Sequence, residues 1–181
     1  MKEFPLDKAF QLIEPGPVVL LTTAFGGRAN VMTMSWHMDV DFTPLIACVV
    51  SEDNYSFEAL RRTKECVIAV PTVDLIKKVI DIGNCSGRDT DKFNAFNLTP
   101  LPAKKVRVPL IAECLANIEC RVTDDRLAAE YNLFILEGVG AWLDAKRREQ
   151  RTFHAKGDGT FVVDGRTIDL RKRMTKWQDS I

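Results

Sequence analysis

The sequence lacks the features that mark several broad classes of protein. Its longest apolar runs, such as PLIACVV at residues 44–50, fall far short of the roughly 20 residues that span a bilayer. The segment MKEFPLDKAF at residues 1–10 has no apolar signal-peptide core. Basic and acidic residues balance at 25 each, which gives no reason to expect nucleic acid or anionic lipid as a partner. We therefore expect a soluble, cytoplasmic protein that binds neither membrane nor nucleic acid.

Cysteine pairs and metal-ligand clusters are also missing. The five cysteines are odd in number and contain no CxxC pair. Three of them lie in apolar, strand-like runs, where cysteine behaves as a small hydrophobic residue. The two histidines, His37 and His154, are far apart and have no ligand residues nearby in the sequence. We expect neither a disulfide framework nor a metal site.

The motifs of several enzyme classes are absent as well. No GxGxxG follows the first expected strand, which disfavours a doubly wound dinucleotide-binding fold. The chain lacks the GK[ST] ending of a Walker loop, and it has neither a nucleophile elbow nor a cysteine-nucleophile signature. The sequence therefore predicts no catalytic side chain.

What is present predicts one mainly β domain. No repeat or linker interrupts the 181 residues, and 46% of them are apolar, enough for a sizeable core. Gly26-Gly27-Arg28 supplies the positive-φ positions of a tight hairpin. Strands are expected at residues 17–24, 29–36, 43–50, 66–71, 114–122 and 132–142, with short β segments at 160–165 and 166–170.

Two segments have helical spacing. Residues 51–65 can begin a helix at Asn54, and residues 73–83 place apolar side chains on one face and stop at Gly83, a typical C-terminal cap. In the strand at 114–122, alternation puts Ala116 on the core face, with Asn117 and Glu119 on the opposite face. An antiparallel barrel with helices outside is the economical architecture, because closure removes exposed strand edges.

The strand NVMTMSW, residues 30–36, has two unusual faces. Alternation gives one face an asparagine, two methionines and a tryptophan, and gives the other Val31, Thr33 and Ser35. The second set is a poor core face. A ligand-facing strand would use its hydroxyls for phosphate or ribityl oxygens and Trp36 to flank an aromatic ring. An ordinary strand would bond those hydroxyls to backbone and bury Trp36, and the pattern alone favours this second interpretation.

Each of two polar segments can likewise be interpreted either as a ligand site or as an ordinary loop. SGRDTDKF, residues 86–93, can form a backbone concavity for an anion, helped by Arg88 and Lys92. It can also be a solvated loop in which Ser86 and Asp89 cap a short helix. SEDNYS, residues 51–56, can meet a phosphate at a helix N-terminus, or Asn54 can simply cap that helix. Taken singly, each segment favours the structural interpretation.

Taken together and in this order, the segments resemble the flavin reductase-like family of FMN-binding split barrels, in particular its flavoredoxin-type branch. The most specific parts are NVMTMSW, SEDNYSFEALRRTKECVIAVP and GNCSGRDTDKF. The resemblance runs from PGPVVLLTT at residues 15–23 to NLFILEGVG at 132–140. It implies a mainly β fold, a split antiparallel Greek-key barrel with a few peripheral helices, formed by residues 1–181 as one domain.

The resemblance also implies a noncovalently bound FMN near the subunit interface of a homodimer, with NAD(P)H as a transient donor. Lys92 would lie near the phosphate, or near the pyrimidine edge of the ring, where its charge would favour the reduced anion. The chain departs from the family in having no proline in RTIDLRKRM and in having Phe134 where some members have histidine. The implied FMN-binding residues are Asn30, Met32, Thr33, Met34, Ser35, Trp36, Asn54, Ser56, Ser86, Arg88, Lys92 and Phe161.

Three functions are compatible with this picture. The leading hypothesis is an FMN-binding oxidoreductase, an NAD(P)H-dependent flavin reductase, in which the cofactor supplies the chemistry and no acid–base residue is required. The second is a flavoredoxin-type electron carrier that exchanges electrons with a redox partner protein. The third is a small barrel that binds another aromatic ligand and has no redox role.

Overall fold

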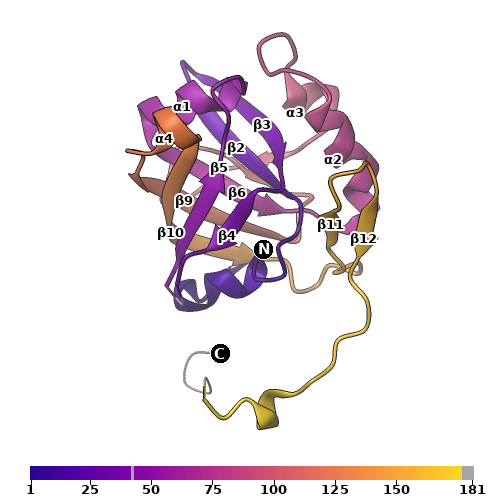
Figure 1. Ribbon diagram of the computed structural model, residues 1–181. Helices are drawn as coiled ribbons and strands as arrows, with labels where there is room; N and C mark the ends of the chain where they lie inside the picture. The colour runs from indigo at the N-terminus through magenta and orange to yellow at the C-terminus, as the bar shows by residue number, and fades with distance from the viewer. Residues whose placement is uncertain (42, 177–181) are drawn as a thin grey trace.

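A strongly curved antiparallel sheet forms the body of the protein (Figure 1). The computed structural model describes residues 1–41 and 43–176; residue 42 and residues 177–181, which the single-domain prediction includes, lie outside it. The strand order is β3-β2-β6-β9-β10-β5-β4, with β1 paired to β10. The strands are β1 Lys2–Phe4, β2 Val19–Phe25, β3 Arg28–Met34, β4 His37–Asp39, β5 Leu45–Val49, β6 Glu65–Val70, β9 Ala116–Asp124 and β10 Leu133–Leu143.

This sheet curls into a barrel that is open between its two end strands. β3 and β4 follow each other in the chain, yet they form no ladder with each other within the described residues. The ladders of the sheet are antiparallel. The predicted fold class, a mainly β split antiparallel barrel with a few peripheral helices, is confirmed. β3 therefore pairs on one side only, and its free edge borders the opening.

The predicted hairpin is confirmed, with its positive φ angles at Gly26 and Gly27 and not at Arg28. β2 and β3 pair from Val19 opposite Met34 to Phe25 opposite Arg28. Gly26 and Gly27 have φ angles of +59° and +78°. Two consecutive positive φ angles are typical of the tight turns that match the twist of antiparallel strands, and glycine adopts them without steric cost.

The other strand predictions are confirmed, with one exception. The segment predicted at 43–50 contains β5, and those predicted at 66–71, 114–122 and 132–142 overlap β6, β9 and β10, with ends that differ by one or two residues. The segment at 160–165 contains β12 (Phe161–Val163), which pairs with β11 (Phe153–Ala155). The strand predicted at 166–170 is wrong: these residues are all exposed, and no strand in the described part of the chain pairs with them. A final small ladder joins β7 (Pro100–Leu101) to β8 (Leu110–Ile111).

Short helices lie around the barrel (Figure 1). Across residues 1–41 and 43–176, no helix has the length and apolar character needed to cross a bilayer. The α-helices are α1 Tyr55–Thr63, α2 Ile76–Gly83, α3 Lys92–Ala95 and α4 Ala128–Tyr131, and 3₁₀ turns span Leu6–Leu12, Val73–Leu75 and Arg171–Arg173.

The predicted helix ends need correction. Gly83 is the last residue of α2 and has no positive φ, so it is not a left-handed cap. A Cβ at Gly83 would lie 3.4 Å from the Thr33 side chain, an ordinary contact distance, so the structure does not require glycine at this position. Ser86 and Asp89 do not cap α3; the Asp91 side chain does, by accepting from the Asn94 N–H.

Both faces of β3 carry a buried apolar side chain, so the view of Val31, Thr33 and Ser35 as a poor core face is wrong for Val31, whereas Thr33 is half-buried and Ser35 is exposed. Met34 packs inside the barrel, while Val31 is fully buried in a second apolar cluster outside it. This outer cluster includes Val79 and Ile82 of α2. Because helices cover the outer surface of the strand, alternate residues meet two different cores.

In β9 too, residues on the face predicted to lie outside the core are buried. Asn117 and Glu119, predicted on its non-core face, are fully buried. The loop after β7 covers them, and the Glu119 carboxylate accepts from the backbone N–H of Val106 at 3.0 Å and from Trp142 Nε1 at 2.7 Å. These donors satisfy the buried carboxylate, so a charged residue occupies a position where alternation predicts solvent.

Two apolar side chains are exposed near the opening of the barrel, and a carboxyl group on β4 has a raised pKa. Trp36 is 72% exposed, so its predicted core alternative is wrong, and Met38 on β4 is 63% exposed. Beside Met38, burial and the adjacent Glu14 carboxylate raise the pKa of Asp39 to about 7. One oxygen of Asp39 is buried without a hydrogen-bond partner among the described residues.

Asp39→Asn is expected to stabilise the protein above pH 7 and to leave it unchanged near pH 4. The folded chain holds a proton on Asp39 that the unfolded chain releases at its ordinary pKa near 3.8, so stability falls as pH rises toward about 7. The carboxyl is only about half-buried, so we expect about 1–2 kcal/mol after solvent screening. Urea unfolding from pH 4 to 8 measures it. Glu130→Gln, at an exposed position on α4, is the control, and equal pH slopes in Asp39→Asn and the parent would contradict the assignment.

Candidate functional site

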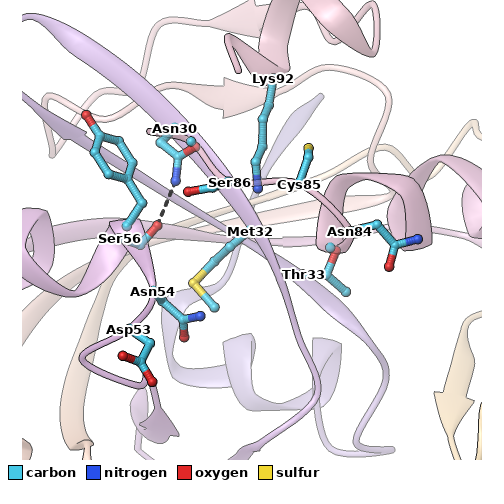
Figure 2. Close-up of a pocket in the computed structure, with 13 residues that line it drawn as sticks. Asn30, Met32, Thr33, Asp53, Asn54, Ser56, Asn84, Cys85, Ser86 and Lys92 are labelled. Atoms are coloured by element: carbon cyan, nitrogen blue, oxygen red, sulfur yellow. Dashed lines mark hydrogen bonds between the residues drawn. The ribbon is translucent and has the colours of Figure 1, made fainter. Parts of the chain in front are cut away.

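Three adjoining cavities lie along β3, where it faces the start of α1 and the loop after α2, and Figure 2 shows residues that line the central one. We call them together the groove. Its central cavity has a volume of about 210 Å³. A cavity of about 430 Å³ shares Met32, Thr33 and Asn54 with it and reaches Trp36, and one of about 300 Å³ reaches Arg28 and Arg88. Small-molecule sites typically measure about 300–1,000 Å³. The central cavity is lined by Asn30, Met32, Thr33, Asp53, Asn54, Tyr55, Ser56, Gly83, Asn84, Cys85, Ser86, Gly87 and Lys92.

A buried polar cluster joins β3 to α1 at one wall of the central cavity. Asn30 Nδ2 donates to Ser56 Oγ at 2.9 Å, and Thr23 Oγ1 donates to the same oxygen at 3.2 Å. Asn30 is 4% exposed, yet its Oδ1 has no hydrogen-bond partner among the described residues. Buried acceptors are nearly always paired, so this oxygen indicates a ligand that brings a donor.

Gly87 lets the loop after α2 pack directly against this cluster. A Cβ at Gly87 would lie 2.2 Å from Asn30 Oδ1 and 2.6 Å from Tyr55 Cδ1. Both separations are far below van der Waals contact. Only glycine allows the loop to pack this close to Asn30, so Gly87 determines the shape of the cavity.

Lys92 places a buried positive charge in the same cavity (Figure 2). Its side chain is 4% exposed, and Nζ donates to the Ile82 carbonyl oxygen at 2.8 Å. None of the ion pairs among the described residues includes Lys92. Burial lowers the pKa of the Lys92 ammonium. An unpaired buried cation is costly, and a bound anion would offset that cost.

The loop around Ser86 is built differently from the predicted backbone concavity. The Arg88 N–H already donates to Ser86 Oγ at 3.2 Å, and the Thr90 N–H donates to the Ser86 carbonyl at 3.1 Å. The Arg88 side chain is exposed and donates to the Asp53 carbonyl oxygen at 3.2 Å. Arg88 therefore ties the loop after α2 to the loop before α1 and lines the cavity of about 300 Å³.

The remaining predicted residues lie in different places. Thr33 lines the groove, although its hydroxyl also donates to the Val79 carbonyl oxygen at 2.5 Å. Asn54 precedes α1 as predicted, but its Oδ1 accepts from the Ser51 N–H and not from the helix. Met34, Ser35 and Trp36 line the outer cavity of about 430 Å³.

Phe161 lies apart from these residues. It makes an edge contact with Phe153, with ring centroids 6.0 Å apart, and packs on the outer apolar cluster. It is not among the residues that line the three cavities of the groove. Its predicted place near a flavin ring stays a prediction.

Sequence reasoning missed several residues that line the central cavity. Asp53 and Tyr55 are direct neighbours of predicted residues and Asn84 lies two residues before Ser86, so their place in the same short segments was the available signal. Cys85 had a second signal, because it lies in a polar loop and not in an apolar strand-like run. Nothing in the sequence indicated that Gly83 contacts Thr33.

The fold and the groove define a split β-barrel with a polar cavity that contains a buried lysine beside the open edge of the barrel. Residues 13–161 match the family model described as "Flavin reductase like domain". This match covers most of the chain, and the chain belongs to the flavin reductase-like family. The resemblance predicted from the sequence is confirmed.

Two relatives show how far the similarity extends. An uncharacterized protein of Archaeoglobus fulgidus is 37% identical over 111 residues, which cover 61% of this chain and 63% of that protein. The chain thus spans less than two thirds of that relative. Uncharacterized protein YddH of Escherichia coli is 32% identical over 178 residues, covering 90% of this chain and 94% of YddH.

Solved structures agree on the fold. An FMN-binding domain of a flavin reductases-like enzyme from Shewanella baltica superposes with a TM-score of 0.87 at 26% identity, covering 93% of this chain and 96% of that one. Flavoredoxin of Desulfovibrio vulgaris superposes with a TM-score of 0.77 at 22% identity, covering 85% and 89%. At that lower identity the flavoredoxin likeness concerns the fold alone.

Proposed function

We propose that the groove holds a noncovalent FMN and that the protein is an FMN-dependent oxidoreductase. The observation that carries the proposal is Lys92, a buried ammonium with no carboxylate partner among the described residues, in the central cavity of a groove that opens beside Met32 and Trp36. A ligand with a phosphate at one end and a flat aromatic ring at the other matches this polarity. The Shewanella and Desulfovibrio neighbours, by their names an FMN-binding enzyme domain and a flavoredoxin, support it.

The side chains of the central cavity suit the polar half of FMN. Lys92 supplies charge for the phosphate, and Ser86 and Ser56 add hydroxyls nearby. The unpaired Asn30 Oδ1 is an acceptor suited to a ribityl hydroxyl. In this proposal Lys92 binds the phosphate and not the pyrimidine edge of the ring. The reason is that Lys92 lies among these polar groups and away from the open cavity at Trp36.

The outer cavity suits the ring. Met32 and Met34 offer polarisable, apolar contacts, and Trp36 offers an aromatic face. FMN supplies hydride acceptance and electron transfer when bound, so the chain itself needs no catalytic acid or base. The protein residues hold the phosphate, orient the ring and limit its contact with water.

We further propose that the protein forms a homodimer that covers the ring. Trp36 and Met38 are 72% and 63% exposed beside the groove, and such exposed apolar groups together mark interaction surfaces. A cytoplasmic location accords with the five cysteines, which are all free. Light scattering of the FMN complex is expected to give the mass of two chains, and Met38→Glu is expected to give monomers. A monomeric parent protein would contradict the dimer.

Anaerobic stopped-flow reduction tests the activity and separates its two forms. Rapid bleaching of the bound flavin by NADH or NADPH is the result expected for the reductase, with the nicotinamide as a transient donor. Reduction only by a redox partner protein would support the electron carrier. A protein that takes up no FMN would exclude both and leave a small barrel that binds another aromatic ligand.

A further inference from the structure

Cys85 differs from the other four cysteines of the chain. Its side chain is partly exposed and lines the central cavity of the groove (Figure 2), whereas the others are at most 1% exposed. Burial raises the pKa of the Cys48 thiol to about 12 and raises that of Cys114 further. A hydrogen bond with Cys120, together with burial, raises the pKa of Cys66 well above its ordinary value. Thiol chemistry on the folded protein is therefore confined to Cys85.

Cys85 lies beside the buried ammonium of Lys92. Cys85 Sγ lies 3.7 Å from the Ile82 carbonyl oxygen, and the Lys92 ammonium donates to that same oxygen at 2.8 Å. Figure 2 shows the two side chains next to each other. A thiolate is the nucleophile in disulfide exchange, and Cys85 is the cysteine that a small disulfide entering the central cavity can reach.

A second observation links this thiol to a ligand site. Asn30 lines the same cavity, is 4% exposed, and has an Oδ1 without a hydrogen-bond partner among the described residues. The cavity that Cys85 shares with this oxygen and with Lys92 measures only about 210 Å³. A tripeptide attached to Cys85 would fill it and displace any anion from Lys92.

We propose that Cys85 is a redox modification site that controls the uptake of FMN, an inference that rests on the proposed function. The Cys85 thiolate attacks one sulfur of a small disulfide such as oxidised glutathione. A new S–S bond forms at Cys85, the S–S bond of the small disulfide breaks, and its other half leaves as a thiolate. The thiol proton passes to solvent, and a free thiol in excess reverses the exchange. Modification at Cys85 and FMN in the groove exclude each other.

The test follows the mass of the intact chain during incubation with oxidised glutathione, with and without saturating FMN. We expect a single glutathionyl group, mapped to Cys85 by peptide mass spectrometry, and a rate about tenfold slower with FMN because the ligand covers the thiol. The modified protein is expected to bind FMN about tenfold more weakly, and dithiothreitol should restore the affinity. The Cys85→Ser variant should bind FMN with the same affinity before and after incubation with oxidised glutathione.

Two outcomes overturn the inference while sparing the proposed function. One is an unmodified protein that takes up FMN but reacts with oxidised glutathione equally fast with and without it. The other is a glutathionylated protein that binds FMN as tightly as the unmodified one. If the unmodified protein takes up no FMN at all, the proposed function fails, and the inference fails with it.

Discussion

Gly87→Ala is expected to abolish measurable FMN binding, weakening it by about 100-fold or more. A methyl group at this position would lie 2.2 Å from Asn30 Oδ1 and 2.6 Å from the Tyr55 ring. Either the loop after α2 moves away, carrying Ser86 and Lys92 with it, or Asn30 turns and loses its bond to Ser56. Both responses change the cavity where the phosphate is proposed to bind. Titration followed by flavin fluorescence measures the effect.

A matched substitution separates this effect from a general cost of replacing glycine. Gly165 has open space around the position of a Cβ and no positive φ, so Gly165→Ala is expected to bind FMN as the parent does. Gly87→Ala should also lose about 1–3 kcal/mol of stability from the forced contact. If that variant does not fold, Gly87→Ala combined with Asn30→Ala and Tyr55→Ala removes both contacts and restores folding without restoring FMN binding. Binding within about threefold of the parent would contradict the role of Gly87.

Lys92→Met is expected to change FMN binding and stability in opposite directions. Loss of the ammonium removes the cation proposed to hold the phosphate, so FMN should bind at least about tenfold more weakly. The FMN-free protein should become more stable by about 1 kcal/mol, because it no longer buries a cation without a carboxylate partner. Such opposite effects are typical of a residue kept for binding at the expense of stability.

The pH dependence of stability gives a second readout for Lys92. Burial lowers the pKa of this ammonium in the folded chain, so the unfolded chain binds more protons as pH approaches the ordinary lysine value of 10.5. The FMN-free parent should therefore gain stability as pH rises through that range, and Lys92→Met should gain less. Lys77→Met, at an exposed position on α2, is the control. If Lys92→Met lowers stability and leaves FMN affinity intact, Lys92 is a structural residue.

The arrangement of strands was predictable because alternation and turn residues determine it locally. Gly26-Gly27 defined the hairpin, and the apolar runs defined β5, β6, β9 and β10. Alternation also shows which residues share a face, but it does not show what covers that face. Val31 on β3 and Glu119 on β9 were misjudged for this reason, since helices and a loop from distant parts of the chain bury them.

The sequence predicted which segments line the site, but it did not predict which of their residues contact one another. The three segments that carried the family resemblance do line one groove, which brings Asn30, Ser56 and Lys92 together. Their separate roles depend on distances across the fold: Asn30 bonds to Ser56, Gly87 packs against Asn30, and Lys92 is buried against Ile82. Sequence spacing carries no information on such distances, so Gly83 and Gly87 entered the site only with the structure.

Parallel titration with FMN and with riboflavin, which lacks the phosphate, tests the central claim most directly. The claim is that this groove binds FMN through a phosphate held at Lys92. It predicts saturation at one FMN per chain, with riboflavin about tenfold weaker or more. Equal affinities for the two flavins would contradict the assignment of the phosphate to Lys92, and binding of neither flavin would contradict the proposed function itself.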